Sequence, residues 1–377
     1  MDQFVDNPDY TLRWPPDLFA REAHRLVTRP IHVSEASRWS NEAEHLLDEA
    51  FTSGSAARDL RRILNVSAAI PWLSQLADIA PRLLREASPR PYFSQRRSMP
   101  DEATAAALPD VVRGMRRMIQ GFLDQHYFAS GIGFACVDGN GDFGKSPTEH
   151  LKERVGKPQL WVDDAAEWED DHPWAIPPED WSVDDLCDFV EVFHDLAARP
   201  TYGWQHDFND CGWHPSRFSK SAGQALYQYR MNKLLDEMRF HYRLADSGED
   251  TGRMVRAMSD GLDDIVTEVL NEVSPHQDQV AHAVALFRRR DSTVEDRRSA
   301  VVTLCGILEE RRSLARQTIQ KKDDAALFDI ANNFHLRHQN AKQYKDYSPE
   351  YLEWIFCWYL STVQLVNRLL SRAADAG

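Results

Sequence analysis

The sequence lacks any long apolar segment. No stretch approaches eighteen uninterrupted apolar residues, which is the length at which a membrane-spanning helix is expected. The first residues, Met1 to Asp6, contain neither a basic segment nor an apolar one, so they do not resemble a secretory signal. We therefore expect no membrane partner.

Cysteine and the common catalytic motifs are also scarce. The chain has 5 Cys in 377 residues, an odd number at scattered positions, which is typical of reduced thiols and predicts a cytoplasmic location. A GxSxG motif and an HExxH motif are both missing. The serine hydrolases and zinc proteases that depend on them are therefore not indicated.

Positive charge is in short supply, with a formal net charge of −15. The deficit is uneven: residues 275–377 carry 15 Lys and Arg against 13 Asp and Glu, and the remainder carries 29 against 46. Non-specific binding to duplex DNA requires many phosphate contacts, so we do not expect it. Only the C-terminal part has a charge balance that would tolerate a nucleic acid.

The residues that are present predict a folded, mainly α protein of several domains. Apolar residues make up 42% of the chain, with eleven Trp, and most of them recur at helical spacing. At most a small β element is expected, near 131–165, where GIGFACV could form a strand. A long helix is predicted from Gly223 to Leu244, and a helix with an apolar face from 350 to 372. Capping signals are predicted at Ser182 (SVDD) and at Ser292 (STVE). The expected domains are 1–155, an acidic Trp- and Pro-rich linker at 156–182, a middle helical domain at 183–274, and a C-terminal helical bundle at 275–377.

A polar cluster at 334–344 (FHLRHQNAKQY) lies between two strongly predicted helices. Arg337 and His338 in it are the residue types that hold a phosphate and transfer a proton at neutral pH. The alternative is that these side chains cap the end of a helix, where His, Arg and Asn commonly satisfy the last carbonyl groups.

The segment from 280 to 372 resembles a HEPN domain, a four-helix bundle found in bacterial toxins and anti-phage proteins. The matching stretches are FRRRDSTVEDRR (287–298), LCGILEER (304–311), LFDIANNFHLRHQN (327–340) and WIFCWYL (354–360). A weaker resemblance to the same bacterial family extends back to about residue 183. Many HEPN domains are metal-independent ribonucleases that work as pairs, so the resemblance implies RNA and a second copy of the chain as partners.

The resemblance also implies roles for individual residues. The implied catalytic residues are Arg337, His338 and Asn340. The implied substrate-binding residues are His335, Lys342, Gln343 and Tyr344. The family pattern has a His four to six residues after its Arg, but this sequence has Lys342, Gln343 and Tyr344 there. Either His338 has taken over proton transfer, or this copy binds RNA without cutting it.

A second chemical cluster occupies 202–214 (YGWQHDFNDCGWH). His206, Cys211 and His214 are residue types and spacings that could supply three of the four ligands of a zinc ion. Cys187 and His194, on the preceding predicted helix, are candidates for the fourth. The alternative is a hydrogen-bonded aromatic loop without metal.

Three hypotheses follow for function. The first is an RNA-directed HEPN-like protein, a metal-independent ribonuclease of stress or anti-phage defence that needs no cofactor. The second is a non-catalytic sensor or adaptor that binds a nucleic acid or a partner protein. The third is a zinc-containing protein that uses the 206–214 segment.

Overall fold

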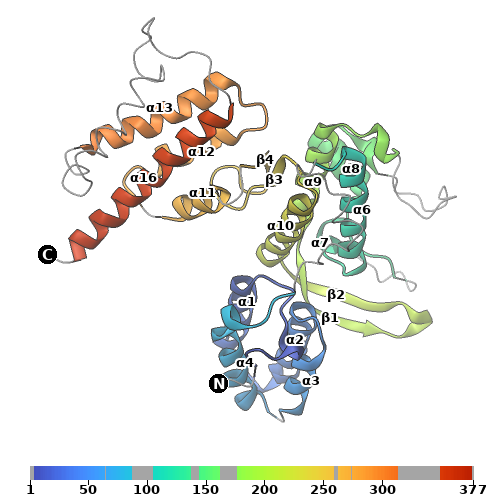
Figure 1. The fold of residues 1–377 in the computed structure, drawn as a ribbon. Helices are drawn as coiled ribbons and strands as arrows, with labels where there is room; N and C mark the ends of the chain where they lie inside the picture. The colour runs from blue at the N-terminus through green and yellow to red at the C-terminus, as the bar shows by residue number, and fades with distance from the viewer. Residues whose placement is uncertain are drawn as a thin grey trace, which may run out of the picture. The chain divides into compact units, whose positions relative to one another are not determined.

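The structure is a computed structural model. It describes residues 4–63, 65–86, 105–136, 144–161, 176–258, 262–272, 274–312 and 349–375. The chain divides into two compact units, Met1–Arg239 and Phe240–Gly377, so the expected middle domain of residues 183–274 is split between them. Both units consist mainly of helices, which confirms the predicted fold class (Figure 1). Within the described ranges, every helix is too short or too polar to cross a bilayer.

The N-terminal unit contains eleven named helices and strands in the described residues. Their bounds are α1 (Pro16–Thr28), α2 (Ala36–Ala50), α3 (Ser55–Arg62), α4 (Val66–Asp78), α6 (Leu108–Asp124), α7 (Ala129–Ile132), α8 (Pro147–Val155), α9 (Val183–Leu196), β1 (Arg199–His206), β2 (Gly212–Ser219) and α10 (Lys220–Glu237), the last completing the unit's core. Short 3₁₀ turns at Pro8–Tyr10, Val33–Glu35, Ala80–Arg82, Pro158–Leu160, Pro178–Asp180 and Phe208–Asp210 connect them.

Helices α1 to α4 pack against one another, and α10 packs against α6 and α9 in a region rich in aromatic rings. Phe122 of α6 lies 5.5 Å from Tyr227 of α10, measured between ring centroids. Phe189 and Phe193 of α9 stack at 4.3 Å. Helix α9 begins at the predicted capping signal, because the Ser182 hydroxyl accepts from the backbone N–H of Asp185. Such aromatic packing adds stabilisation beyond the buried area alone.

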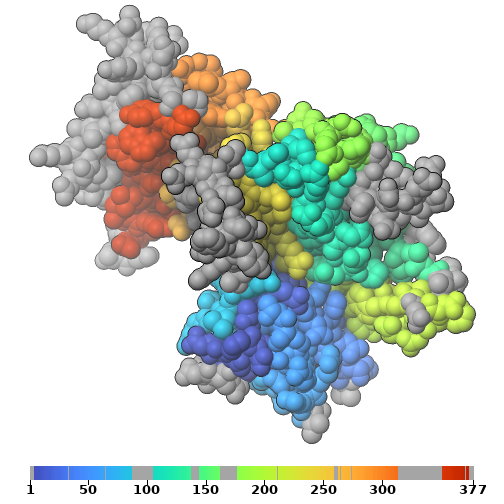
Figure 2. Space-filling view, turned by 45° about the vertical axis from the view of Figure 1, so that its right-hand side comes forward, coloured from blue at the N-terminus to red at the C-terminus, as the bar shows by residue number. Residues whose placement is uncertain are grey.

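Strands β1 and β2 form an antiparallel pair, here called the long hairpin (residues 199–219). Its register runs from Arg199↔Ser219 at the base to His206↔Gly212 at the turn. A Cβ on Gly203 would meet the His214 carbonyl oxygen at 2.3 Å, so only glycine allows the strands to approach this closely. Figure 2 shows the long hairpin, in yellow-green, projecting from the side of the unit's helices.

A buried ion pair anchors the base of the long hairpin to α2. The Arg199 side chain, 1% exposed, donates from Nε to Glu49 Oε2 at 2.5 Å. The Tyr127 hydroxyl donates to the other Glu49 oxygen at 3.1 Å, and the Arg199 guanidinium lies over the Trp14 ring. The hairpin is thus fixed to segments more than a hundred residues away in the chain.

The C-terminal unit packs four described helices beside a short antiparallel pair. The bounds are β3 (Tyr242–Leu244), β4 (Met254–Arg256), α11 (Leu262–Asn271), α12 (Gln277–Arg288), α13 (Val294–Glu310) and α16 (Pro349–Asp375). Helix α13 packs on α12 and α16, and α11 packs on α16. They share one core, to which α16 contributes Leu352, Ile355, Phe356, Tyr359, Leu360, Val363 and Val366.

Three local predictions are corrected by the structure. The segment GIGFACV does not form a strand: α7 ends within it at Ile132, and the backbone N–H of Gly133 bonds back to the Ala129 carbonyl. The two small sheets lie instead at 199–219 and 242–256. The helix predicted to run from Gly223 to Leu244 ends at Glu237, because Arg239 adopts a left-handed conformation with φ 52°.

The capping residue of α13 is also shifted by one position. The predicted box used Ser292 and Glu295, whereas the observed box pairs Thr293 with Asp296. The Ser292 hydroxyl donates instead to the carbonyl of Leu286 in α12. This is a tertiary contact that the local spacing does not reveal.

Candidate metal centre

Four sulfur- and nitrogen-bearing side chains converge at the turn end of the long hairpin. They are Cys136, His206, Cys211 and His214, here called the Cys/His cluster, and their potential ligand atoms all lie within 4.8 Å of one another. Cys136 Sγ is 3.6 Å from His206 Nδ1, and Cys211 Sγ is 3.1 Å from His214 Nε2. Tetrahedral zinc with ordinary bond lengths separates its ligand atoms by about 3.4–3.8 Å. Small side-chain movements would therefore complete the coordination geometry.

The hairpin register explains why the two His meet. Trp204 and His206 are two residues apart in β1, so their side chains point to the same face. The register places His214 opposite Trp204, which puts His206 and His214 in diagonal positions on one face. The two imidazole rings are 5.1 Å apart.

The turn brings Cys211 to the same face. The 3₁₀ turn Phe208–Asp210 contains Asn209 in a left-handed conformation, with φ 48°. Gly212, with φ 91°, then starts β2. These two positive φ angles reverse the chain within a few residues and return Cys211 next to His214. Asn and Gly are the residues that best tolerate this conformation.

Cys136 comes from a distant part of the chain. The backbone of Gly133, with φ 79°, redirects the chain after α7. Phe134 then packs against the His214 ring at 5.0 Å, which places Cys136 beside His206, 70 residues away in sequence. Sequence reasoning missed this residue because no local spacing connects it with the other three.

The sequence proposed other residues for the fourth position. Cys187 is buried in α9, and His194 of the same helix lies 3.5 Å from the carboxylate of Asp195. Neither belongs to the Cys/His cluster. The structure therefore brings together His206, Cys211 and His214, as the sequence suggested, and adds Cys136 to them.

The surroundings of the cluster are aromatic and partly buried. The His214 side chain is 1% exposed, and Trp204 packs edge-on against its ring at 4.5 Å. Burial, together with the nearby His214, lowers the pKa of His126. An apolar shell that favours neutral imidazole suits metal binding, because a His ligand must be deprotonated.

The polar cluster at 334–344 lies outside the described residues. This applies to all the residues that the HEPN resemblance singled out, namely His335, Arg337, His338, Asn340, Lys342, Gln343 and Tyr344. Their roles remain predictions.

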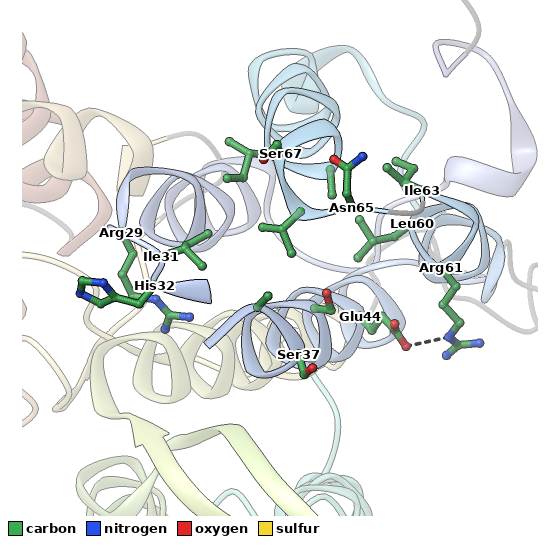
Figure 3. Close-up of a pocket in the computed structure, with 15 residues that line it drawn as sticks. Arg29, Ile31, His32, Ser37, Glu44, Leu60, Arg61, Ile63, Asn65 and Ser67 are labelled. Atoms are coloured by element: carbon green, nitrogen blue, oxygen red, sulfur yellow. Dashed lines mark hydrogen bonds and ion pairs between the residues drawn. The ribbon is translucent and has the colours of Figure 1, made fainter. Parts of the chain in front are cut away.

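A separate cavity of about 660 Å³ lies among α2, α3 and α4 (Figure 3). Both Arg side chains that line it have carboxylate partners. Arg61 Nε is 2.7 Å from Glu44, the contact drawn in Figure 3, and Arg29 is 2.7 Å from the buried Glu42. The polar groups of this cavity are thus largely satisfied by the protein itself, and it gives no specific indication of a ligand.

Comparisons of the chain with protein-family models, curated proteins and solved structures find no match.

Proposed function

We propose that this protein binds one zinc ion through Cys136, His206, Cys211 and His214. The observation that carries this proposal is the convergence of two thiols and two imidazoles, from three segments of the chain, within 4.8 Å. Zinc prefers this set of ligands in tetrahedral geometry. The alternative, a pair of thiol–imidazole hydrogen bonds, would explain each close pair but not the meeting of both pairs at one point.

The role of the ion would be structural. Four protein ligands fill the coordination sphere of zinc and leave no open position for water or substrate. An isolated two-stranded hairpin is only marginally stable in water. The ion would tie the turn end of the long hairpin to the segment after α7, while Arg199 and Glu49 fix its base.

Metal analysis of the purified full-length chain tests this proposal. We expect one zinc per chain in the reduced wild-type protein and in Cys187→Ala, a matched control that removes a buried thiol outside the cluster. Cys136→Ser should lose most of the zinc. An equal zinc content in Cys136→Ser and wild type, or no stoichiometric zinc in wild type, would rule the site out.

We propose as a second function that the C-terminal unit acts on RNA as a HEPN-like ribonuclease. Two observations favour it. One is the resemblance. The other is that α12 and α13, which precede residues 313–348 in the sequence, share one core with α16, which follows them. In this proposal His338 removes the proton of a 2′-hydroxyl and Arg337 stabilises the charge on the phosphate. Asn340 and Gln343 position these groups, His335 and Lys342 contact the RNA, and Tyr344 stacks on a base.

RNA cleavage assays distinguish this proposal from the adaptor hypothesis. We expect cleavage that resists EDTA, is lost in Arg337→Ala, and persists in Arg372→Ala, an exposed Arg near the end of α16. RNA binding without cleavage would support the adaptor. HEPN pairing implies a homodimer, and sedimentation of the full chain measures it independently.

A further inference from the structure

The C-terminal unit contains a cavity lined by several arginines, here called the arginine cavity. Its volume is about 280 Å³, at the small end of the range for small-molecule sites. Arg256 of β4, Arg288 of α12 and Arg297 of α13 line it, together with Glu350 and Glu353 of α16. Four separate elements therefore contribute charged groups to one cavity.

The arginines of this cavity are incompletely satisfied by the described residues. Arg288, only 4% exposed, bonds Asp263 at 2.7 Å through Nη2. Within the described ranges, the buried Nε atoms of Arg288 and Arg297 have no hydrogen-bond partner. The Arg297 guanidinium lies over the Phe287 ring, and Arg256 Nε donates to the backbone carbonyl of Arg290. Buried polar groups of this kind usually have a partner.

The positive charges of neighbouring arginines in the cavity also repel one another. Burial and the neighbouring Arg256 lower the pKa of Arg297, against the effect of Glu353. Burial likewise lowers the pKa of Arg288. A bound anion would relieve the repulsion and supply the missing acceptors, and guanidinium groups bind phosphate especially well.

A second cavity adjoins the first. It has a volume of about 590 Å³ and is lined by Trp354, Trp358 and Cys357, together with the same Glu350 and Glu353. This tryptophan cavity is more open to solvent, and Trp354 is 48% exposed. The two indole rings stack at 5.5 Å. Burial and Glu353 raise the pKa of Cys357 to about 12, so its thiol stays protonated and is not a nucleophile at neutral pH.

The two cavities thus present guanidinium groups, then carboxylates, then indole rings. These match the three parts of a nucleotide. Arginines bind the phosphate, carboxylates accept from ribose hydroxyls, and aromatic rings stack on bases. We propose that the adjoining cavities form one binding site for a nucleoside monophosphate, either free or at the end of an RNA strand. This inference does not rest on the zinc site or on residues 334–344, because it uses none of them.

Calorimetric titration of the full-length protein with adenosine 5′-monophosphate tests the proposal. Inorganic phosphate and adenosine are the probes for each half of the ligand, and both should bind more weakly than the nucleotide. Arg297→Gln should weaken nucleotide binding about tenfold or more, since a hydrogen bond to a charged group is lost. Arg298→Gln is the matched control, because Arg298 is the next residue in α13, pairs with Glu295 and does not line the cavity. It should bind within about twofold of wild type.

A second pair of variants tests the stacking of the base on the tryptophan rings. Trp354→Ala should weaken nucleotide binding about fivefold or more but leave phosphate binding unchanged. Leu365→Ala, an equally exposed apolar residue of α16 outside both cavities, should have no effect. Competition by a 5′-phosphorylated RNA, and not by its 5′-hydroxyl counterpart, would identify an RNA end as the source. If the nucleotide binds and the 5′-phosphorylated RNA does not compete with it, the ligand is the free nucleotide.

Three results would overturn the inference. The first is wild-type protein that does not bind the nucleotide at millimolar concentration, and the second is equal binding by Arg297→Gln. The third is nucleotide binding no tighter than that of inorganic phosphate, which would remove the base-stacking assignment and with it the nucleotide. Thermal unfolding of each variant, measured in parallel, separates loss of binding from loss of folding.

Discussion

The two antiparallel hairpins of this protein are held in different ways. The long hairpin has strands of eight residues, an ion pair at its base and the Cys/His cluster at its turn. The short hairpin, β3 and β4, has strands of three residues, and its Arg243 bonds the Asp263 carboxylate at the start of α11. The turn of the longer ribbon is far from its base, and polar or potentially metal-binding side chains attach it at both ends.

The largest expected effect is that of removing zinc. In small domains a structural zinc contributes about 10 kcal/mol or more of binding free energy, and most of that would be lost with the ion. Hydrogen exchange of the full chain should then accelerate at 199–219 after chelation, while 242–256 remains protected. Equal acceleration in both hairpins would show that the ion stabilises the whole chain. No change in either would contradict a structural role.

Removing the ion pair at the base of the long hairpin is expected to have the second largest effect on stability. Glu49→Ala leaves Arg199 buried without its carboxylate, which typically costs about 3–5 kcal/mol. Asp291→Ala is the control, because its pair with Arg289 is largely exposed and such pairs contribute about 0–1 kcal/mol. Chemical denaturation, followed by one probe in each unit, measures both. A loss below about 1 kcal/mol for Glu49→Ala would mean that α2 and the hairpin repack without the pair.

Two glycines allow a smaller comparison. In Gly203→Ala the new methyl group would meet the His214 carbonyl and the Trp213 ring, and overpacking of this kind costs about 1–3 kcal/mol. For Gly306, in α13, no described residue outside the backbone of its own helix has an atom within 4 Å of the added carbon. Gly306→Ala should therefore stabilise its helix by about 0.5–1 kcal/mol. A lower unfolding temperature for Gly203→Ala and a higher one for Gly306→Ala would support the close strand approach in the long hairpin.

The smallest expected effect concerns pH. His45 of α2 contacts the long hairpin through the Pro200 carbonyl at 3.1 Å and the Trp213 ring. Burial lowers its pKa, and Arg199 acts in the same direction against the nearby Glu49. The unfolded state therefore binds the proton more readily, so this contribution to stability is complete above about pH 6.5 and is lost as the pH falls below it.

His45→Gln should remove that part of the pH dependence. Denaturation midpoints at pH 7.5 and 5.5 measure it, and His24→Gln, with a half-exposed side chain on α1, is the control. If the stability of His45→Gln depends on pH as steeply as that of the wild type, other groups cause the dependence.

Part of the candidate site follows from the sequence and part does not. His206, Cys211 and His214 fall within nine residues, so their spacing alone suggested a common ligand. Cys136 is 70 residues from His206, in a segment that the sequence predicted as a strand. Its place depends on Gly133 and on the packing of Phe134 against His214. The arginine cavity was missed for the same reason, since its lining comes from β4, α12, α13 and α16.

The helical class, the start of α9 at Ser182 and the apolar face of α16 could all be predicted from local sequence, because caps and helical periodicity act between residues three or four apart. Which distant groups meet depends on how the elements pack. Arg199 and Glu49 are 150 residues apart, and Cys136 reaches the hairpin only when α7 and the strands are packed. Such contacts form because packing places the segments side by side, and no local pattern encodes them.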